Sequence, residues 1–202
     1  MLAKWSVETL NEIVDAELEL LPADMRARFI HISRLVEEFG LDRIREPHIK
    51  HIRGVLWEMR MKGRDGVSRA LYVTAAGRRV VVVRIFIKEN RQYSKSRDRT
   101  RSAAREGNLM TSTRDLHKKW SKGRDYRKAH EELEPEFALA RAVIRARSAA
   151  ELTQAELARR MKTTQSVIAR LESGRALPST KTLERLAKAT GTRLTITFES
   201  PR

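Results

Sequence analysis

The sequence contains no cysteine, which excludes a disulfide framework and thiolate chemistry. No apolar run approaches the roughly 18 residues of a membrane-spanning helix, and no N-terminal apolar region is typical of a signal peptide. No glycine-rich phosphate loop is present, and no set of His, Asp or Glu has the spacing of a metal site. We therefore expect a cytoplasmic protein with no metal, no cofactor and no membrane partner.

Positive charge is what the chain has in excess. Its 202 residues carry a formal net charge of +16. Residues 1–109 contain 22 Lys and Arg against 15 Asp and Glu, and residues 110–202 contain 20 against 11. Polyanions are the natural partners of such a surface, so both halves are expected to meet nucleic acid. The alternative is a generally basic surface with no specific partner.

The most informative stretch is Thr153–Gly174, which reads TQAELARRMKTTQSVIARLESG. Thr153 can cap a first helix, a short break follows at Lys162, and a second helix buries Ile168 and Leu171 on one face. Four residues near the start of the second helix then lie on its outer side: Gln165, Ser166, Ala169 and Arg170. Because Gln pairs with adenine and Arg with guanine in the major groove, the pattern predicts a helix-turn-helix that reads DNA. The alternative is a surface helical hairpin in another kind of bundle.

Residues 136–199 resemble the Xre/phage-repressor family of five-helix DNA-binding domains, and within it the HigA-type antitoxins. The motifs that carry the resemblance are EPEFALARAVIRAR, LTQAELARRM, TTQSVIARLESG, PSTKTLERLAKATG and TRLTITFE. It implies a homodimer on operator DNA, with contacts from the helix that begins near Thr164. Base contacts are implied for Gln165, Ser166 and Arg170, and backbone contacts for Gln154 and Arg175. The family usually has Gly in the turn where this chain has Lys162, and a left-handed backbone there costs a non-glycine residue about 1 kcal/mol.

The first half reads as a mixed segment of helices and strands. Two helices are expected at Thr9–Leu20 and Pro22–Phe39, and a basic helix at Ser94–Glu106. Strands are expected at Leu2–Val7, Val55–Met61, Arg69–Thr74 and Arg79–Lys88. On the last strand one face is wholly apolar: Val81, Val83, Ile85 and Ile87. The predicted fold class is an α+β domain, two helices on a small antiparallel sheet, joined to an all-α helix-turn-helix domain with a short C-terminal strand at Arg193–Phe198.

Residues 1 to about 105 resemble the HigB branch of the RelE-type toxins, small ribonucleases that cleave messenger RNA on the ribosome. The matching segments are KHIRGVLWEMRMKG, SRALYVTAAGRRVVVVRIFIKEN and the basic helix that follows. Two positions depart from the family pattern. Ser68 stands where an aromatic usually precedes the central-strand arginine, and Tyr93–Ser94 stands where Thr-Pro is common.

Cleavage of RNA by transesterification requires three things: a base for the 2′-OH, stabilisation of the crowded phosphate and a proton for the 5′ oxygen. Arginines hold the phosphate charge, and a lysine whose pKa neighbouring cations lower can act as the base. The resemblance assigns these roles, together with a tyrosine for stacking or proton transfer, to Arg60, Arg69, Arg84, Lys88 and Tyr93. The alternative is that these side chains form a solvated face, end strands or pack under a helix.

The chain changes character near residue 107. We expect a toxin-like domain at 1–106, a linker at 107–115 and an antitoxin-like domain at 116–202. A chain that started at Met110 would resemble a complete antitoxin, which suggests that two adjacent reading frames have become one. Residues 116–133 are the predicted masking helix, and three acidic residues are available to meet arginines: Glu131, Glu132 and Glu134. The alternative is that masking displaces the basic helix Ser94–Glu106 without touching the site.

The predicted function is a toxin–antitoxin fusion. Its first half would be a ribosome-dependent messenger-RNA endoribonuclease, held inactive by the second half within the chain or across a dimer. The second half would bind operator DNA and repress its own gene. One alternative is a DNA-binding transcriptional regulator with a catalytically dead N-terminal interaction domain. Another is a protein whose two halves both bind nucleic acid without chemistry.

Overall fold

The computed structural model describes residues 4–64, 66–87 and 110–198 of the chain. The chain divides into two compact units, Met1–Glu134 and Pro135–Arg202. The division falls inside helix α5 (Arg124–Ala149), at a proline whose ring removes one backbone N–H from the helical ladder. This boundary lies beyond the linker expected at 107–115, because residues 110–134 pack with the first unit.

The first unit is built on a six-stranded sheet with the strand order β2-β3-β4-β5-β1-β6. Its strands are β1 Ser6–Thr9, β2 Ile49–Arg53, β3 Leu56–Gly63, β4 Gly66–Ala75, β5 Arg79–Ile87 and β6 Thr111–Ser112. β1 runs parallel to β5, and every other neighbouring pair is antiparallel. The expectation of a small antiparallel sheet was therefore wrong. The sheet is mixed, and β2 and β6, which lack a clear alternating pattern, extend its two edges.

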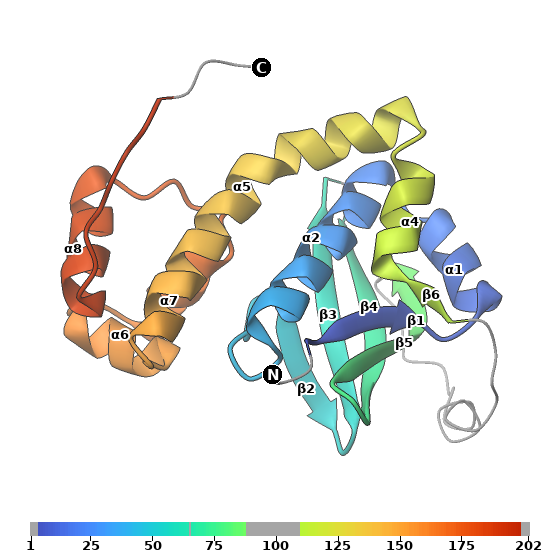
Figure 1. Cartoon of the computed structure of the whole chain (residues 1–202), viewed down its shortest axis with the longest axis horizontal. Helices are drawn as coiled ribbons and strands as arrows, with labels where there is room; N and C mark the ends of the chain where they lie inside the picture. The colour runs from blue at the N-terminus through green and yellow to red at the C-terminus, as the bar shows by residue number, and fades with distance from the viewer. Residues whose placement is uncertain (1–3, 65, 88–109, 199–202) are drawn as a thin grey trace. The chain divides into compact units, whose positions relative to one another are not determined.

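Two helices pack against this sheet. α1 (Glu12–Glu19) is capped by the side chain of Asn11, which accepts a hydrogen bond from the backbone N–H of Val14. α2 (Ala23–Phe39) ends at Gly40, where φ is +79°. As the helical spacing predicted, α2 buries an apolar stripe that includes Phe29, Ile32, Leu35 and Val36. Figure 1 shows α2 lying across one face of the sheet.

A β-bulge in β5 changes the face expected for its apolar residues. Leu71 pairs with Arg84 and Tyr72 with Val82, so Val83 is an extra residue in the ladder. Val80 and Val82 are fully buried before the bulge, and Ile85 is buried after it, while Ile87 is 41% exposed. The single face predicted through Val81, Val83, Ile85 and Ile87 was wrong, because strict alternation does not anticipate an inserted residue.

The segment after Met110 adds a strand and two helices to the first unit. β6 pairs with β1, and the hydroxyl of Thr9 donates to the carbonyl oxygen of Thr111 at 3.2 Å. α4 (Thr113–Trp120) and the first part of α5 bury four apolar or aromatic residues: Leu116, Trp120, Tyr126 and Ala129. These side chains complete the core beside α2, which explains why the compact unit continues to Glu134.

The second unit is all helical. After α5 come α6 (Gln154–Arg160), α7 (Gln165–Glu172) and α8 (Thr180–Thr190). They enclose a core of Val143, Leu152, Leu157, Ala158, Met161, Ile168, Leu171 and Leu186. Thr153 and Glu156 cap α6 reciprocally, as the sequence suggested for Thr153. Residues 192–198 form no strand, so the predicted C-terminal strand was wrong; a lone extended segment without a partner has no ladder to join.

None of the helices in the described parts of the chain is both long and apolar enough to span a bilayer.

Candidate nucleic-acid interfaces

The helix-turn-helix presents a polar surface at the start of α7. Thr164, Gln165, Ser166 and Arg170 are exposed, whereas Ile168 and Leu171 on the opposite side are buried. Thr164 is the N-cap, and its hydroxyl lies 2.9 Å from that of Ser166. The unit therefore combines a buried stripe that holds the helix with an outer face of amide, hydroxyl and guanidinium groups. This is the donor and acceptor set that reads base edges.

Two of the residues expected to touch the DNA backbone are already engaged within the unit. Gln154 is 4% exposed, and its amide donates to Glu172 at 2.8 Å. The Gln165 amide in turn donates to the Gln154 side-chain oxygen at 3.5 Å. Arg175 forms an ion pair with Glu136 at 3.5 Å and keeps about a third of its side chain exposed. In this geometry Gln154 orients Gln165, and Arg175 is the more accessible of the two.

A buried ion pair lies beneath the recognition helix and was not foreseen. Arg147 on α5 pairs with Glu172 at the end of α7, and each side chain is 3% exposed. Arg147 also donates to the carbonyl oxygen of Leu152 at 3.0 Å. The network links α5, the turn before α6, and α7. Removing one partner of such a pair leaves a buried charge uncompensated. The sequence does contain a signal for this ion pair, because Arg147 is a charged residue on an otherwise apolar face of its helix.

On the sheet of the first unit, the structure brings Arg60 and Arg69 together. They are direct partners across β3 and β4, so both side chains project from the same face. Between them lies Glu58, whose carboxylate accepts from Arg60 Nε and from Arg69 Nη1, each at 2.5 Å. Glu58 is fully buried, while Arg60 is 28% and Arg69 16% exposed. We name Arg60 and Arg69 the arginine pair. Glu58 is the carboxylate that they share.

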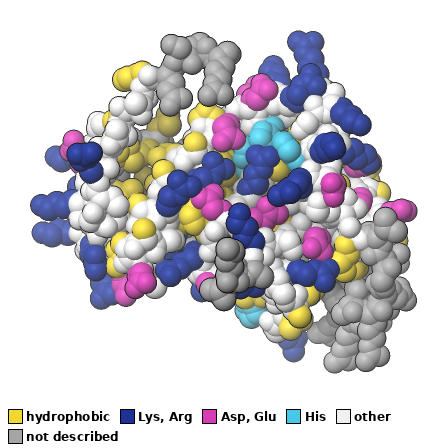
Figure 2. Space-filling model, viewed as in Figure 1, with side chains coloured by type: hydrophobic (Ala, Val, Ile, Leu, Met, Phe, Trp, Pro, Cys, Tyr) yellow, Lys and Arg dark blue, Asp and Glu magenta, His cyan; other side chains and the backbone are white. Residues whose placement is uncertain are grey.

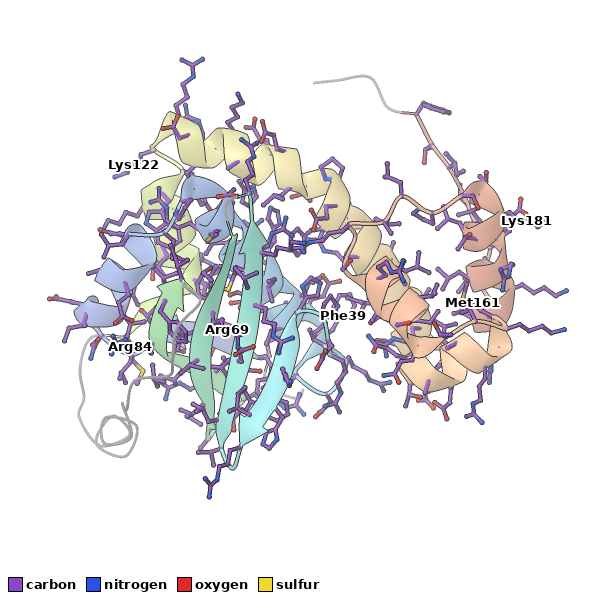
Figure 3. The ribbon with its side chains drawn as sticks, turned by 180° about the vertical axis from the view of Figure 1, so that it is seen from behind. Phe39, Arg69, Arg84, Lys122, Met161 and Lys181 are labelled. Carbon is purple, nitrogen blue, oxygen red and sulfur yellow. The ribbon has the colours of Figure 1, made fainter. Side chains whose placement is uncertain are left out.

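The face that carries the arginine pair is the one opposite α2. The buried residues Met59 and Met61 alternate with Glu58 and Arg60 along β3, so the two sets point to opposite sides of the sheet. Figure 3 shows the sheet from behind, with Arg69 and Arg84 labelled. Among the described residues of this unit, no helix lies over this face. Within the described residues, Arg60 and Arg69 keep part of their side chains exposed on it.

Arg84 is oriented by a different carboxylate. It faces Leu71 across the ladder and forms an ion pair with Glu17 on α1 at 2.6 Å. The other oxygen of Glu17 accepts the backbone N–H of Ile85 at 2.7 Å, at the edge of β5 that β1 no longer covers. Arg84 is 45% exposed and separate from the arginine pair. Lys88, Tyr93 and the expected helix Ser94–Glu106 lie outside the described residues.

Of the acidic residues expected to meet arginines of the first half, Glu132 meets one of them, and Glu134 lies near a histidine. Glu132 pairs with Arg64 at 2.7 Å, and Glu134 lies 3.9 Å from His31 on α2. The carboxylates that meet Arg60, Arg69 and Arg84 come from Glu58, Glu46 and Glu17, within the first half of the chain. The expected contact is therefore found at Arg64 but at none of the three described arginines of the proposed site, because α4 and the first part of α5 join the unit at β1, α1 and α2, whereas the arginine pair lies on the other side of the sheet.

Comparison with protein families agrees with this two-part organisation. Residues 16–106 match the family described as phage derived protein Gp49-like (DUF891), and residues 143–196 match the helix-turn-helix family. The chain is similar to Gp49-like proteins in its first half and to helix-turn-helix proteins in its second. No curated protein matches it. The combination supports a toxin–antitoxin-like fusion whose second part is of the DNA-binding regulator type.

A third group lies at the contact of α2 with α5 in the Gp49-like unit. His31, His130 and Glu134 have ligand atoms within 4.8 Å of one another. The sequence gave no spacing signal for this group, because His31 is about a hundred residues from the other two. Its rings and charges are considered below.

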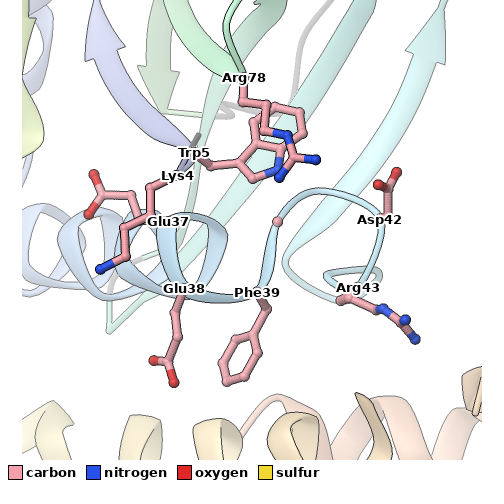
Figure 4. Close-up of a pocket in the computed structure, with 9 residues that line it drawn as sticks. Lys4, Trp5, Glu37, Glu38, Phe39, Asp42, Arg43 and Arg78 are labelled. Carbon is pink, nitrogen blue, oxygen red and sulfur yellow. The ribbon is translucent and has the colours of Figure 1, made fainter. Parts of the chain in front are cut away.

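A shallow cavity of about 240 Å³ opens at the end of α2 (Figure 4). Trp5 forms part of its wall and packs against the backbone of Gly40. Acidic and basic groups alternate around the rim: Lys4, Glu37, Glu38, Asp42, Arg43 and Arg78. None of the residues predicted for catalysis lines it. A rim of mixed charge selects no class of ligand, so we assign none.

Proposed function

We propose that the chain is a fusion of a HigB/RelE-type messenger-RNA endoribonuclease with a HigA-type, Xre-family antitoxin. The toxin half is held inactive by the linked half, which binds operator DNA and represses its own gene. One observation carries the proposal: an open sheet face with two adjacent arginines lies in the same chain as an exposed base-reading helix. The Gp49-like and helix-turn-helix matches support the same combination.

The arginine pair suits a phosphodiester. Each guanidinium has donors beyond the one that Glu58 occupies, and the second carboxylate near Arg60, that of Glu46, is more than half exposed at 4.0 Å. Because Glu58 fixes both arginines before a ligand arrives, little side-chain entropy is lost on binding. In the proposed reaction Arg60 and Arg69 hold the scissile phosphate and its developing charge. Arg84 contacts a neighbouring phosphate, Lys88 is the base, and Tyr93 stacks on a nucleobase or transfers a proton.

A second candidate function is a transcriptional regulator whose Gp49-like domain only binds partners. The observation that favours it is charge compensation: each described arginine of the proposed site already has a carboxylate partner within the domain. In this case the arginines hold the sheet and α1 together, and no RNA is cleaved.

Expression in a bacterial host separates the two functions. Three forms are compared: residues 1–109, residues 1–134 and the full chain. We expect residues 1–109 to arrest growth and to cleave messenger RNA on ribosomes. The full chain should be far less toxic, and residues 110–202 supplied in trans should rescue growth. Residues 1–134 retain the helices that pack on α2 but lack the helix-turn-helix, so their toxicity shows which part neutralises.

The chemistry is tested by Arg60→Ala with Arg69→Ala in a translation-coupled cleavage assay. Loss of the phosphate contacts is expected to lower cleavage by a hundredfold or more, which corresponds to about 3 kcal/mol. The matched control is Arg53→Ala, which removes an exposed arginine from the edge strand β2. If the isolated half is harmless and the double variant changes nothing, the regulator takes the place of the enzyme.

A further inference from the structure

Three of the five histidines of the chain meet where α4 and α5 lie against α2. The ring of His31 stacks on that of His130, with centroids 4.1 Å apart, and the ring of His117 lies 4.8 Å from His130. They come from three helices: α2, α4 and α5. Figure 2 shows histidine side chains gathered in one patch among basic side chains. We name these three residues the histidine cluster.

Hydrogen bonds fix the rings of the cluster. His31 is fully buried, and its Nε2 lies 3.2 Å from the carbonyl oxygen of His130. Nη1 of Arg34 lies 3.2 Å from His130 Nε2, and Nδ1 of His117 lies 2.8 Å from the hydroxyl of Tyr126. An arginine is always protonated and can only donate, so His130 Nε2 must be the acceptor. The geometry therefore requires a His130 ring without a proton at that nitrogen.

The surroundings of the cluster are mostly positive. His130 faces Arg34 and His31 from α2, and His117 from α4; Glu134, one turn further along α5, lies near His31 at 3.9 Å. Burial, then Arg34, then His117 lower the pKa of His130 to about 4. Burial and Arg34 lower the pKa of His117. Both rings are thus neutral near pH 7. A proton added to either ring is repelled by the positive charge of Arg34.

The same geometry disfavours a metal ion at His31, His130 and Glu134. The two imidazole rings are stacked with an interplanar angle of 24°, so their lone pairs run nearly parallel instead of converging on one ion. One ring nitrogen of His130 already accepts from a cation. A divalent ion would need His130 to turn and Arg34 to leave. Protons are the better-suited ligand of this cluster.

We propose that residues 111–134 form a proton-controlled latch, in which neutral His117 and His130 hold α4 and the first part of α5 on α2 and protonation of these two rings releases them. Other contacts also hold the latch: Leu116, Tyr126 and Ala129 are buried, and the hydroxyls of Thr111 and Thr113 donate to Asp15 and Glu37. Two residues of β6 pair with β1, Glu132 pairs with Arg64, and Lys119 pairs with Glu19. The apolar anchor is Trp120, which is 5% exposed and carries the guanidinium of Arg26 over its ring at 5.4 Å.

The pH dependence has a definite sign. A released His130 has an ordinary pKa near 6.5 and takes up a proton as the pH falls below that value, whereas the docked residue stays neutral until about pH 4. The released state therefore binds more protons between these limits, and docking weakens as the pH falls. At about pH 5 the equilibrium shifts toward release by about tenfold for His130 alone, after allowance for its partial exposure.

The experiment uses the full chain with Trp5→Phe and Trp57→Phe, which leaves Trp120 as the only tryptophan. Quenching of its fluorescence by acrylamide is measured from about pH 7.5 to about pH 5, with circular dichroism at each pH. We expect quenching to rise several-fold while the helix and sheet signals stay constant. His117→Gln with His130→Gln keeps hydrogen-bonding groups without titration, and should make quenching independent of pH. His51→Gln, at an exposed histidine on β2, is the matched control and should behave as the parent does.

Three outcomes overturn the latch. The first is flat quenching in the parent chain. The second is quenching that rises only together with loss of circular dichroism, because that reports global unfolding. The third is a pH-independent cluster that zinc chloride stabilises and a chelator loosens, which makes it a metal site. If the double variant does not fold, amide hydrogen exchange of residues 113–134 in the parent at the two pH values decides. None of these readouts requires nuclease activity, so the latch and the proposed function fail independently.

Discussion

Gly174 shows at the scale of a single residue why a glycine follows α7. Its φ is +71°, and a Cβ added there would overlap the backbone carbonyl of Glu136. Backbone cannot move aside as a flexible side chain does. Gly174→Ala is therefore expected to lower the free energy of unfolding by about 3 kcal/mol or more. Gly191→Ala is the control: its φ is +70°, but a Cβ there meets nothing, so only about 1 kcal/mol is lost. Urea unfolding of both variants measures the difference, and equal losses would contradict the steric argument.

Lys162 occupies the turn of the helix-turn-helix with φ at +49°. Its side chain is exposed, so the left-handed backbone is strained without an evident contact in return. Lys162→Gly is expected to raise the free energy of unfolding by up to about 1 kcal/mol, because glycine adopts this conformation without a Cβ clash. The same change at exposed Lys181, in the first turn of α8, should lower stability by about 0.5–1 kcal/mol. Thermal unfolding measures both variants. If Lys162→Gly is less stable than Lys181→Gly, the backbone at Lys162 is not strained.

At the scale of elements, α7 is positioned from beneath by buried groups, and we expect its exposed groups to contact DNA. Gln165 and Arg170 lie on its outer face, and Gln154, held by Glu172, orients the Gln165 amide. Gln165→Ala with Arg170→Ala should relax specificity at the contacted base pairs, at about 1–3 kcal/mol for each lost contact. Gel shifts on the region upstream of the gene, with single-base operator variants, measure this. The control is Lys181→Ala at an exposed site on α8, and unchanged specificity in the double variant contradicts the base contacts.

Elements with a strong period were predictable from the sequence, and those defined by long-range pairing were not. The apolar stripe of α2, the capping box at Thr153 and the buried pair Ile168 and Leu171 follow from helical spacing and local hydrogen bonds, which neighbouring residues determine. β6 is two residues long and exists only because β1 offers it an edge. The bulge at Val83 likewise arises from pairing with β4, and no local pattern encodes it.

The candidate sites also contain residues that the sequence could identify and residues that only long-range packing brings together. Arg60 and Arg69 were identified through the family resemblance, and strand register places them side by side. Their buried partner Glu58 was not foreseen, because burial of a carboxylate depends on which cations lie across the ladder. The histidine cluster joins residues about a hundred positions apart, and only the packing of α4 and α5 on α2 brings them together.

At the scale of the whole molecule, the boundary between compact units does not coincide with the boundary between family resemblances. The Gp49-like match ends at residue 106, and the helix-turn-helix match begins at 143. The residues between them include α4 and the first part of α5, whose Trp120 and Tyr126 belong to the core of the first unit. The segment between the two matches therefore completes the core of the first unit. A chain that lacks this segment must therefore be tested for loss of stability as well as for toxicity.

The C-terminal tail provides the last prediction, which concerns assembly on DNA. Residues 193–198 form no strand with any described segment, and Ile196 is 57% and Phe198 96% exposed. One short helix-turn-helix reads few base pairs, and two-fold partners bind half-sites about one DNA turn apart. An extended segment with apolar side chains is suited to pair with its copy in a second chain.

We therefore expect a dimer in sedimentation experiments at micromolar concentration. Ile196→Ser with Phe198→Ser should weaken it by tenfold or more and remove cooperativity from operator gel shifts. Leu177→Ser removes an equally exposed apolar side chain, 95% exposed, outside the tail and should change neither. A strict monomer with and without operator DNA would exclude the tail as a dimer contact, and so would equal effects of the tail and Leu177 variants.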